Sequence, residues 1–284
     1  MPLYESALIA LILSACEFLP IPGIAHLEVI SKLTSWDTPD PRLIMAIHAG
    51  CLLGVVFYYL SDLLKIGYYT YDAITHKRVG PVTKIGVCLI LATLPAAALV
   101  IILGRSNFFL HLSIDAIAYA TIGFGVLLGL SSYVNHHLVW RNILNIEGER
   151  KDSLRHMSYQ QAITIGLSQI CAFIPGVSRY GVAFTAGLFI GIRPEASARF
   201  SAMLAIPSLI AMLAIDLTQS QARAESYSNV AQTDYVTLGF AGILSMVMAL
   251  GVLHLFVKYL GKHGTGIIVA YRILLGSLLL FLFH

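Results

Sequence analysis

The chain has 284 residues, of which 57% are hydrophobic and 12% are charged. Soluble domains carry about twice that charged fraction, so this composition excludes an ordinary soluble domain. The formal net charge of +3 is too small to indicate nucleic-acid binding. The four cysteines lie in apolar stretches without the spacing of a metal site, so we expect free buried thiols.

Six apolar segments approach the roughly 20 residues that a bilayer-spanning helix needs. Charges, glycine or proline bound each of them. They predict six membrane-spanning helices at about 43–61, 85–104, 115–134, 199–217, 236–257 and 266–283. The fold class that follows is an all-α polytopic membrane protein, with the intervening segments, 62–84 among them, expected as loops.

Two further apolar segments, at about 3–34 and 159–192, are each interrupted by a turn signal. The first contains Pro20-Ile21-Pro22-Gly23 and the second Pro175-Gly176. Each half is too short to span a bilayer comfortably. A helix, a turn and a helix at membrane depth are typical of a re-entrant hairpin, whose broken backbone must be buried in protein or line a polar cavity.

The two interrupted segments resemble each other at an offset of 155 positions. Each repeat then contains one hairpin and three spans, and an odd number of crossings inserts the second repeat upside down. We therefore expect a single membrane domain, 1–284, built as an inverted-topology repeat of about 1–135 and about 157–284, with its site where the broken helices meet. The matches are Tyr4/Tyr159, Ala7/Ala162, Cys16/Cys171, Phe18/Phe173, Leu19/Ile174 and Pro20/Pro175.

The basic residues indicate an orientation. One face of this arrangement receives twelve of the 18 Lys and Arg residues, and by the positive-inside rule it is cytoplasmic. Both termini and the mouth of the first hairpin are then expected outside. The twelve are Lys65, Lys77, Arg78, Lys84, Arg141, Arg150, Lys151, Arg155, Arg193, Arg199, Lys258 and Lys262; Arg42, Arg105 and Arg223, with Lys32 nearby, fall opposite.

Charged and titratable side chains inside apolar segments are candidates for a functional site, because they are unfavourable in a membrane. Most of them lie in or beside the two hairpins. If the hairpin tips meet, a carboxylate, an imidazole, a hydroxyl and a guanidinium converge at helix N-termini, which suits an anion and phosphoryl transfer. The candidates are Glu17, His26, Glu28, His48, Arg179 and Arg272, with Ser178 beside Arg179.

Each candidate has a second interpretation. Glu17 and Arg179 could form a buried ion pair that holds the tips together, while His26 satisfies a backbone carbonyl. His48 could line the cavity or bond to a neighbouring helix. Arg272 could contact a phosphate or pair with Asp216.

Several motifs resemble the undecaprenyl-diphosphate phosphatase family of the bacitracin-resistance type, in the same order along nearly the whole chain. Glu17-Phe-Leu-Pro-Ile-Pro-Gly-Ile-Ala-His26 resembles its signature E-F-L-P-[VI]-S-S-T-G-H. Pro175-Gly-Val-Ser-Arg-Tyr-Gly181 resembles P-G-x-S-R-S-G. The flanks Met157–Ala162, Ile47–Gly50, Ala198–Ser201, Leu204–Pro207 and Ala270–Arg272 resemble further family segments.

The resemblance implies a bacterial inner-membrane hydrolase that removes the terminal phosphate of a C55 polyprenyl diphosphate on the periplasmic side, recycling the lipid carrier of cell-wall synthesis. It implies catalytic roles for Glu17, His26, Ser178 and Arg179, and a divalent cation, Mg²⁺ or Ca²⁺, with Glu17 as ligand. The expected partners are a polyprenyl diphosphate or phosphate and the membrane. The predicted substrate contacts are Arg179, Ser178, His48, Tyr180 and Arg272.

The chain departs from the family pattern in four places. Leu13 replaces a glutamate that would lie one turn before Glu17, and Pro22–Ala25 replaces S-S-T-G, so that Gly23 stands where a hydroxyl is expected. Tyr180 and Ala183 replace a serine and a threonine. We predict a hydrolase. The alternatives are a homologue that transports a polyprenyl phosphate without cleaving it, or a regulatory paralogue.

Overall fold

The computed structural model describes residues 1–34, 36, 39–77, 80–103, 113–139, 154, 156–223 and 233–283. Within these ranges the protein is entirely helical, with no strand, which confirms the predicted all-α class. The helices are α1 (Leu3–Phe18), α2 (Gly23–Thr34), α3 (Pro41–Tyr58), α4 (Leu60–His76), α5 (Pro81–Leu103), α6 (Ile114–Val134), the π-helix η1 (Asn135–Val139), α8 (Tyr159–Ser168), the 3₁₀ helix η2 (Gln169–Phe173), α9 (Arg179–Phe189), α10 (Pro194–Arg223), α11 (Tyr235–His263) and α12 (Gly266–Phe283).

Six of these helices are long and apolar enough to cross a membrane, as predicted. The six segments are Pro41–Tyr58, Pro81–Val100, Ile114–His137, Pro194–Leu217, Tyr235–Leu260 and Gly266–Phe283. The expected loop at 62–84 is wrong, because α4 occupies most of it and packs against α5. The apolar pattern there is interrupted by Asp62, Lys65 and Asp72. These charges do not prevent a helix, because none of the residues of α4 is buried.

Short-range chemistry sets where several helices begin. The side chains of Asp40, Ser113, Ser158, Ser178 and Asp234 each accept a hydrogen bond from a backbone N–H in the first turn of the helix that follows. Such N-caps satisfy donors that the helix itself leaves unpaired. In α3 the cap is followed by Pro41 at the first helical position, where the missing N–H has no consequence.

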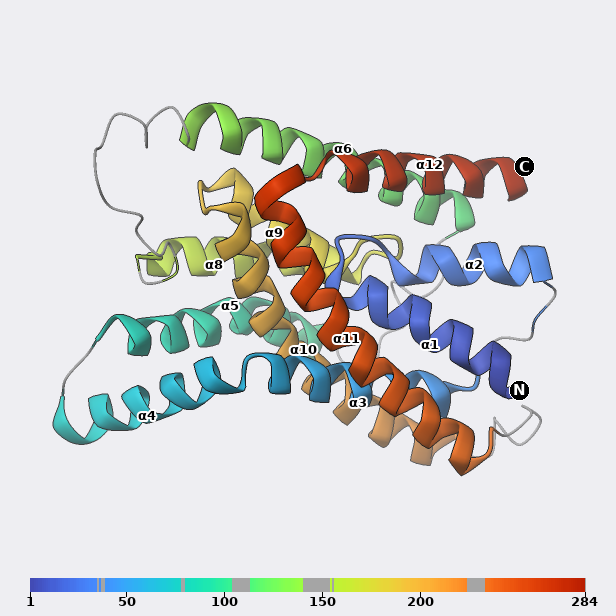
Figure 1. Cartoon of the computed structure of the whole chain (residues 1–284), viewed down its shortest axis with the longest axis horizontal. Helices are drawn as coiled ribbons and strands as arrows, with labels where there is room; N and C mark the ends of the chain where they lie inside the picture. Colours follow the sequence, from blue (N-terminus) through green and yellow to red (C-terminus); the bar gives the residue numbers. More distant parts are fainter. Residues whose placement is uncertain are drawn as a thin grey trace.

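The elements form two series with the same order. The helix-turn-helix pair α1–α2 precedes α3, α5 and α6, and the pair α8–α9 precedes α10, α11 and α12. The series are interleaved in space: α1 packs against α11 and α8 against α5, while α2 packs against α12 and α9 against α6. In Figure 1 both termini lie at one end of the molecule, and the turns of both pairs point to its middle.

Helices α3 and α11 approach closely because small residues line their contact. A Cβ atom on Gly54 would lie 2.6 Å from Cβ of Ala249, and one on Gly50 would lie 2.8 Å from Cβ of Ser245 and overlap the carbonyl oxygen of Gly242. Small residues spaced four apart allow such backbone contact between membrane helices.

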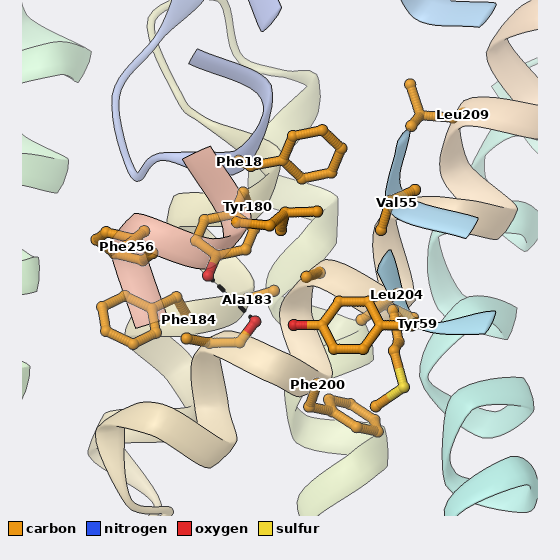
Figure 2. Packing of buried hydrophobic residues seen from close by; sticks show 14 of the residues in the cluster. Phe18, Val55, Tyr59, Tyr180, Ala183, Phe184, Phe200, Leu204, Leu209 and Phe256 are labelled. Carbon is orange, nitrogen blue, oxygen red and sulfur yellow. Dashed lines mark hydrogen bonds between the residues drawn. The ribbon is translucent and has the colours of Figure 1, made fainter. Parts of the chain in front are cut away.

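A buried aromatic cluster fills the space between α1, α3, α9, α10 and α11. Figure 2 shows Tyr180, Phe184 and Phe256 close together, with Phe18 on one side of them and Phe200 on the other. The rings of Tyr180, Phe184 and Phe256 have centroids 5.8–6.2 Å apart. The Tyr180 hydroxyl donates to the carbonyl of Ala198 at 3.1 Å. The hydroxyl of Tyr180 is therefore paired although it lies among apolar side chains.

Asp40 joins the start of α3 to the segment before α11. Its carboxylate accepts from the backbone N–H groups of Arg42 at 2.9 Å and Thr233 at 3.0 Å, and pairs with the Arg42 guanidinium at 2.7 Å. Burial raises the pKa of this carboxyl, but the hydrogen bonds from Arg42 and Thr233 outweigh burial and hold its pKa at about 2.

The Asp40→Asn variant is expected to be less stable than the wild type by about 2 kcal/mol at neutral pH. The folded pKa lies below the unfolded value of about 3.9, so this contribution is complete above about pH 4 and is lost as the pH falls toward about 2. Unfolding temperatures of both proteins in detergent at pH 7 and pH 3 measure it. The difference should roughly halve at pH 3, and an equal difference at both pH values contradicts the assignment.

Candidate active site

Prolines and a glycine shape the two turns. Helix α1 ends at Phe18 because Pro20 and Pro22 cannot donate the hydrogen bonds that would continue it. In the second turn Gly176 has φ = +90°, and a Cβ atom there would collide with the backbone of Ile117 in α6. Glycine is the residue that adopts this conformation without strain.

The two turns contact each other directly. The Ser178 hydroxyl donates to the carbonyl of Leu19 at 3.2 Å and accepts from the N–H of Gly181 at 3.0 Å, which caps α9. A Cβ atom on Gly181 would lie 3.1 Å from Cα of Pro20, so the first turn of α9 rests on the first hairpin. The residues around Pro20 and Ser178 therefore lie in contact, as the sequence predicted.

Arg272, on α12, donates hydrogen bonds to both turns. Its side chain is among the largest that are fully buried, at 1% exposure. The guanidinium donates to the carbonyls of Thr121 at 3.1 Å, Pro20 at 3.0 Å and Gly176 at 3.4 Å. These contacts join one carbonyl from each turn to α6 and α12, whereas Asp216, one of its two expected partners, is not among them.

Glu17 and Arg179 form an ion pair across the two hairpins. Nη2 of Arg179 lies 2.7 Å and 2.9 Å from the two carboxylate oxygens of Glu17. The Arg179 side chain is 26% exposed and the Glu17 side chain is 13% exposed, so the pair is partly accessible. Nη1 of Arg179 contacts the sulfur of Met212 in α10. Within the described residues, Nη1 and Nε therefore donate to no oxygen, and a ligand could use both.

His26 has a different set of contacts. Its Nδ1 lies 2.8 Å from the carbonyl of Pro22 and 3.6 Å from the sulfur of Cys16, and its Nε2 lies 2.6 Å from the hydroxyl of Tyr271. Because a carbonyl only accepts, Nδ1 carries the proton, and in the neutral ring Nε2 accepts from Tyr271. Within the described part of the chain His26 makes no hydrogen bond to Glu17 or Arg179.

His48 and Tyr180 differ in their hydrogen bonding. Nδ1 of His48, on α3, is buried and has no hydrogen-bond partner among the described residues. Glu17, Arg179 and Asp216 are near enough to act on its imidazole electrostatically. Tyr180 is 3% exposed and directs its hydroxyl to Ala198 inside the aromatic cluster, away from the pair that Arg179 forms.

The sequence did not reveal two residues of this region. Tyr271 meets His26 only because α12 packs on α2, and its ring stacks on the imidazole with centroids 5.7 Å apart. Met212 lies beside Arg179 because α10 packs on α9. The one available signal for Tyr271 was its position directly before the intramembrane Arg272.

The donor set does not fit the expected divalent cation. At a phosphate site Mg²⁺ is bound through one or two carboxylates together with waters and substrate oxygens, whereas both oxygens of Glu17 already accept from Arg179. Leu13, one turn earlier on α1, contributes no carboxylate, and the described residues contain no group of three or more His, Cys, Asp or Glu side chains that could hold a metal. We therefore derive no step through a cation.

The sequence matches the family described as "Bacitracin resistance protein BacA" over residues 6–278. It is 32% identical over 284 residues to "Undecaprenyl-diphosphatase 1" of Pseudoalteromonas translucida (strain TAC 125), with 99% of each chain covered. It is 33% identical over 284 residues to "Undecaprenyl-diphosphatase" of Thioalkalivibrio sulfidiphilus (strain HL-EbGR7), with 100% of each chain covered. The similarity thus extends from end to end and includes both hairpins.

Proposed function

This chain belongs to the bacitracin resistance protein BacA family, and from that premise we propose that it hydrolyses undecaprenyl diphosphate to undecaprenyl phosphate and inorganic phosphate. The observation that carries the proposal is the geometry of Arg179. Its Nη2 is held by Glu17, while Nη1 and Nε donate to no oxygen of the described residues, and the side chain is 26% exposed. Nε–H and Nη1–H point to different edges of the guanidinium, so each can donate one charge-assisted hydrogen bond to a phosphate oxygen.

The N-terminus of α9 adds to the same anion site. Arg179 is the first residue of α9, and the unpaired N–H groups of a helix N-terminus favour negative charge. Ser178 caps this helix and ties it to Leu19 of the other hairpin. We assign Glu17 to orient Arg179 and Ser178 to orient the helix, so that the charge that develops on the terminal phosphate meets fixed donors.

Two predicted substrate contacts do not enter the proposal. The donors of Arg272 reach three backbone carbonyls and the hydroxyl of Tyr180 reaches Ala198, so both side chains serve the packing around the site. Two histidines remain that could take the proton from an attacking water, His26 and His48.

The aromatic cluster favours hydrolysis over transport. Glu17 and Arg179 are followed in the chain by Phe18 and Tyr180, and both of these rings lie in the cluster. A head group bound at Arg179 would have to pass this packed region, and separate its rings, to reach the opposite side of the protein. A hydrolase needs access from one side only.

We propose that the protein is a multi-pass protein of the bacterial inner membrane, with α1–α2 and α8–α9 as re-entrant hairpins of an inverted repeat. Arms of 16 residues or fewer, the matching order of elements and their reciprocal packing support this. The C-terminal end of α4 and the start of α5 lie at the end of the molecule opposite the termini (Figure 1). Lys77 directly follows α4 and Lys84 is in the first turn of α5, which favours outside termini and a periplasmic site. Arg78, Arg105, Arg141, Arg150, Lys151 and Arg155 lie outside the described residues.

Phosphate release from undecaprenyl diphosphate by the purified protein in detergent tests the function. We expect release that continues in excess EDTA, because Arg179 holds both oxygens of Glu17 and Leu13 supplies no second carboxylate beside it. The same reaction with added Mg²⁺ or Ca²⁺, and isothermal titration of each cation into the substrate-free protein, test the cation separately. Release that stops in EDTA and returns with a cation contradicts the assignment of the donor set, and folded protein that releases no phosphate contradicts the function.

A further inference from the structure

Among the described residues, Nδ1 of His48 is the one buried imidazole nitrogen without a hydrogen-bond partner. This nitrogen is shielded from solvent and meets no donor or acceptor, and the other buried unpartnered side-chain atoms there are hydroxyl oxygens. A buried polar atom without a hydrogen bond costs on the order of 1–3 kcal/mol. An unpartnered atom of this kind in a native site calls for an explanation, and an absent ligand or water is one.

The charges around His48 are those of the proposed site. Glu17 from α1, Arg179 from α9 and Asp216 from α10 act on the imidazole. These three groups come from different helices that pack around α3 or its neighbours. The only other titratable side chain near them on α3 is Cys51, which is fully buried.

Helix α3 also packs on α1, which carries Glu17. Cys51, one turn after His48, contacts the hydroxyl of Ser14, which lies one turn before Glu17. Residues three apart share a helix face, so the His48–Cys51 face of α3 meets the Ser14–Glu17 face of α1. Side chains on a helix lean toward its N-terminus, which brings the Glu17 carboxylate back toward the level of Ser14.

His26 lies in a different environment. Its two ring nitrogens are engaged by Pro22 and by Tyr271 of α12, and the sulfur of Cys16 completes its surroundings. Glu17 and Cys16 are adjacent in the chain, about 100° apart around α1. His26 therefore belongs to the α2–α12 side of α1, and His48 to the α3–α10 side where Glu17 meets Arg179.

We propose that His48 is a catalytic residue of the Glu17–Arg179 site and accepts the proton of the attacking water through Nδ1. This inference rests on the proposed function. As the water oxygen bonds to the terminal phosphorus, its proton moves to Nδ1. The bond between that phosphorus and the bridging oxygen breaks, and its electron pair stays on the lipid monophosphate. The imidazolium then returns the proton to solvent, which leaves inorganic phosphate and undecaprenyl phosphate.

The test compares His48→Gln with the wild type in the phosphate-release assay across pH. Glutamine keeps a hydrogen-bonding group of similar reach but accepts no proton. We expect kcat to fall between about a hundredfold and ten thousandfold, KM to stay within about threefold, and the rise of kcat/KM with pH that reports a base in the free enzyme to disappear. His254→Gln is the matched control, because His254 is an exposed residue of the spanning helix α11.

Two further variants keep the test decisive. His48→Ala in added imidazole should regain part of the lost rate even if either substitution lowers stability, because free imidazole can accept the proton. His26→Gln should keep the rise of kcat/KM with pH. A His48→Gln enzyme that keeps that rise, or a His26→Gln enzyme that loses it, overturns the assignment of the base while phosphate release by the wild type upholds the function. No release by the wild type overturns both.

Discussion

Arg179→Lys is expected to lower kcat/KM for phosphate release at least about a hundredfold, the usual effect of removing one positioned donor to the transition state. Lysine retains the charge but not the planar fork. In the present geometry one nitrogen of Arg179, Nη2, holds both oxygens of Glu17 at 2.7 Å and 2.9 Å, and Nη1 and Nε donate to no oxygen of the described residues. A single ammonium cannot serve both partners in that arrangement.

Arg199→Lys provides the matched control for this prediction. Arg199 forms the same type of pair with Asp62, at 3.0 Å, but the two side chains are 39% and 37% exposed and lie away from the hairpin tips. Exposed pairs contribute about 0–1 kcal/mol, so we expect activity and unfolding temperature to change little. Equal activity of Arg179→Lys and Arg199→Lys would show that the Glu17–Arg179 pair is only structural.

The fold could be predicted from the sequence where it depends on local composition. Spans are set by the length of apolar runs, and the turns at Pro20 and Gly176 by residues that break helices. Helix α4 was missed for the same reason, because its charges ended the apolar run although they do not end a helix. Hydropathy therefore locates the membrane-spanning helices, but it does not predict a polar helix such as α4 that follows a spanning helix in the chain.

The candidate site was predictable only in part. That Glu17 and Arg179 would pair follows from the penalty of an isolated charge among apolar residues. The separation of His26 from His48 does not follow, because it depends on how α1 rotates between α3 and α12. Arg272 illustrates the same limit: an intramembrane arginine suggests a phosphate, and only the packing shows that three carbonyls surround it.

Gly50→Ala and Gly54→Ala are expected to destabilise the protein by about 3 kcal/mol each, near the upper end for an overpacked core. A methyl group on Gly50 would overlap the backbone of Gly242, and one on Gly54 would lie 2.9 Å from the carbonyl oxygen of Met246. Neither obstacle is a side chain that could rotate away, so α3 and α11 must separate. Because α3 also carries His48 beside Glu17, activity should fall with stability.

Gly251→Ala on α11 is the control, since a Cβ atom at Gly251 would meet nothing within 4 Å. Alanine favours helix over glycine by about 1 kcal/mol, so this variant should be as stable as the wild type or slightly more stable. Unfolding temperatures in detergent and the monodisperse fraction after gel filtration measure all three. If Gly50→Ala and Gly251→Ala unfold at the same temperature, the close contact of α3 with α11 is not what holds the two helices together.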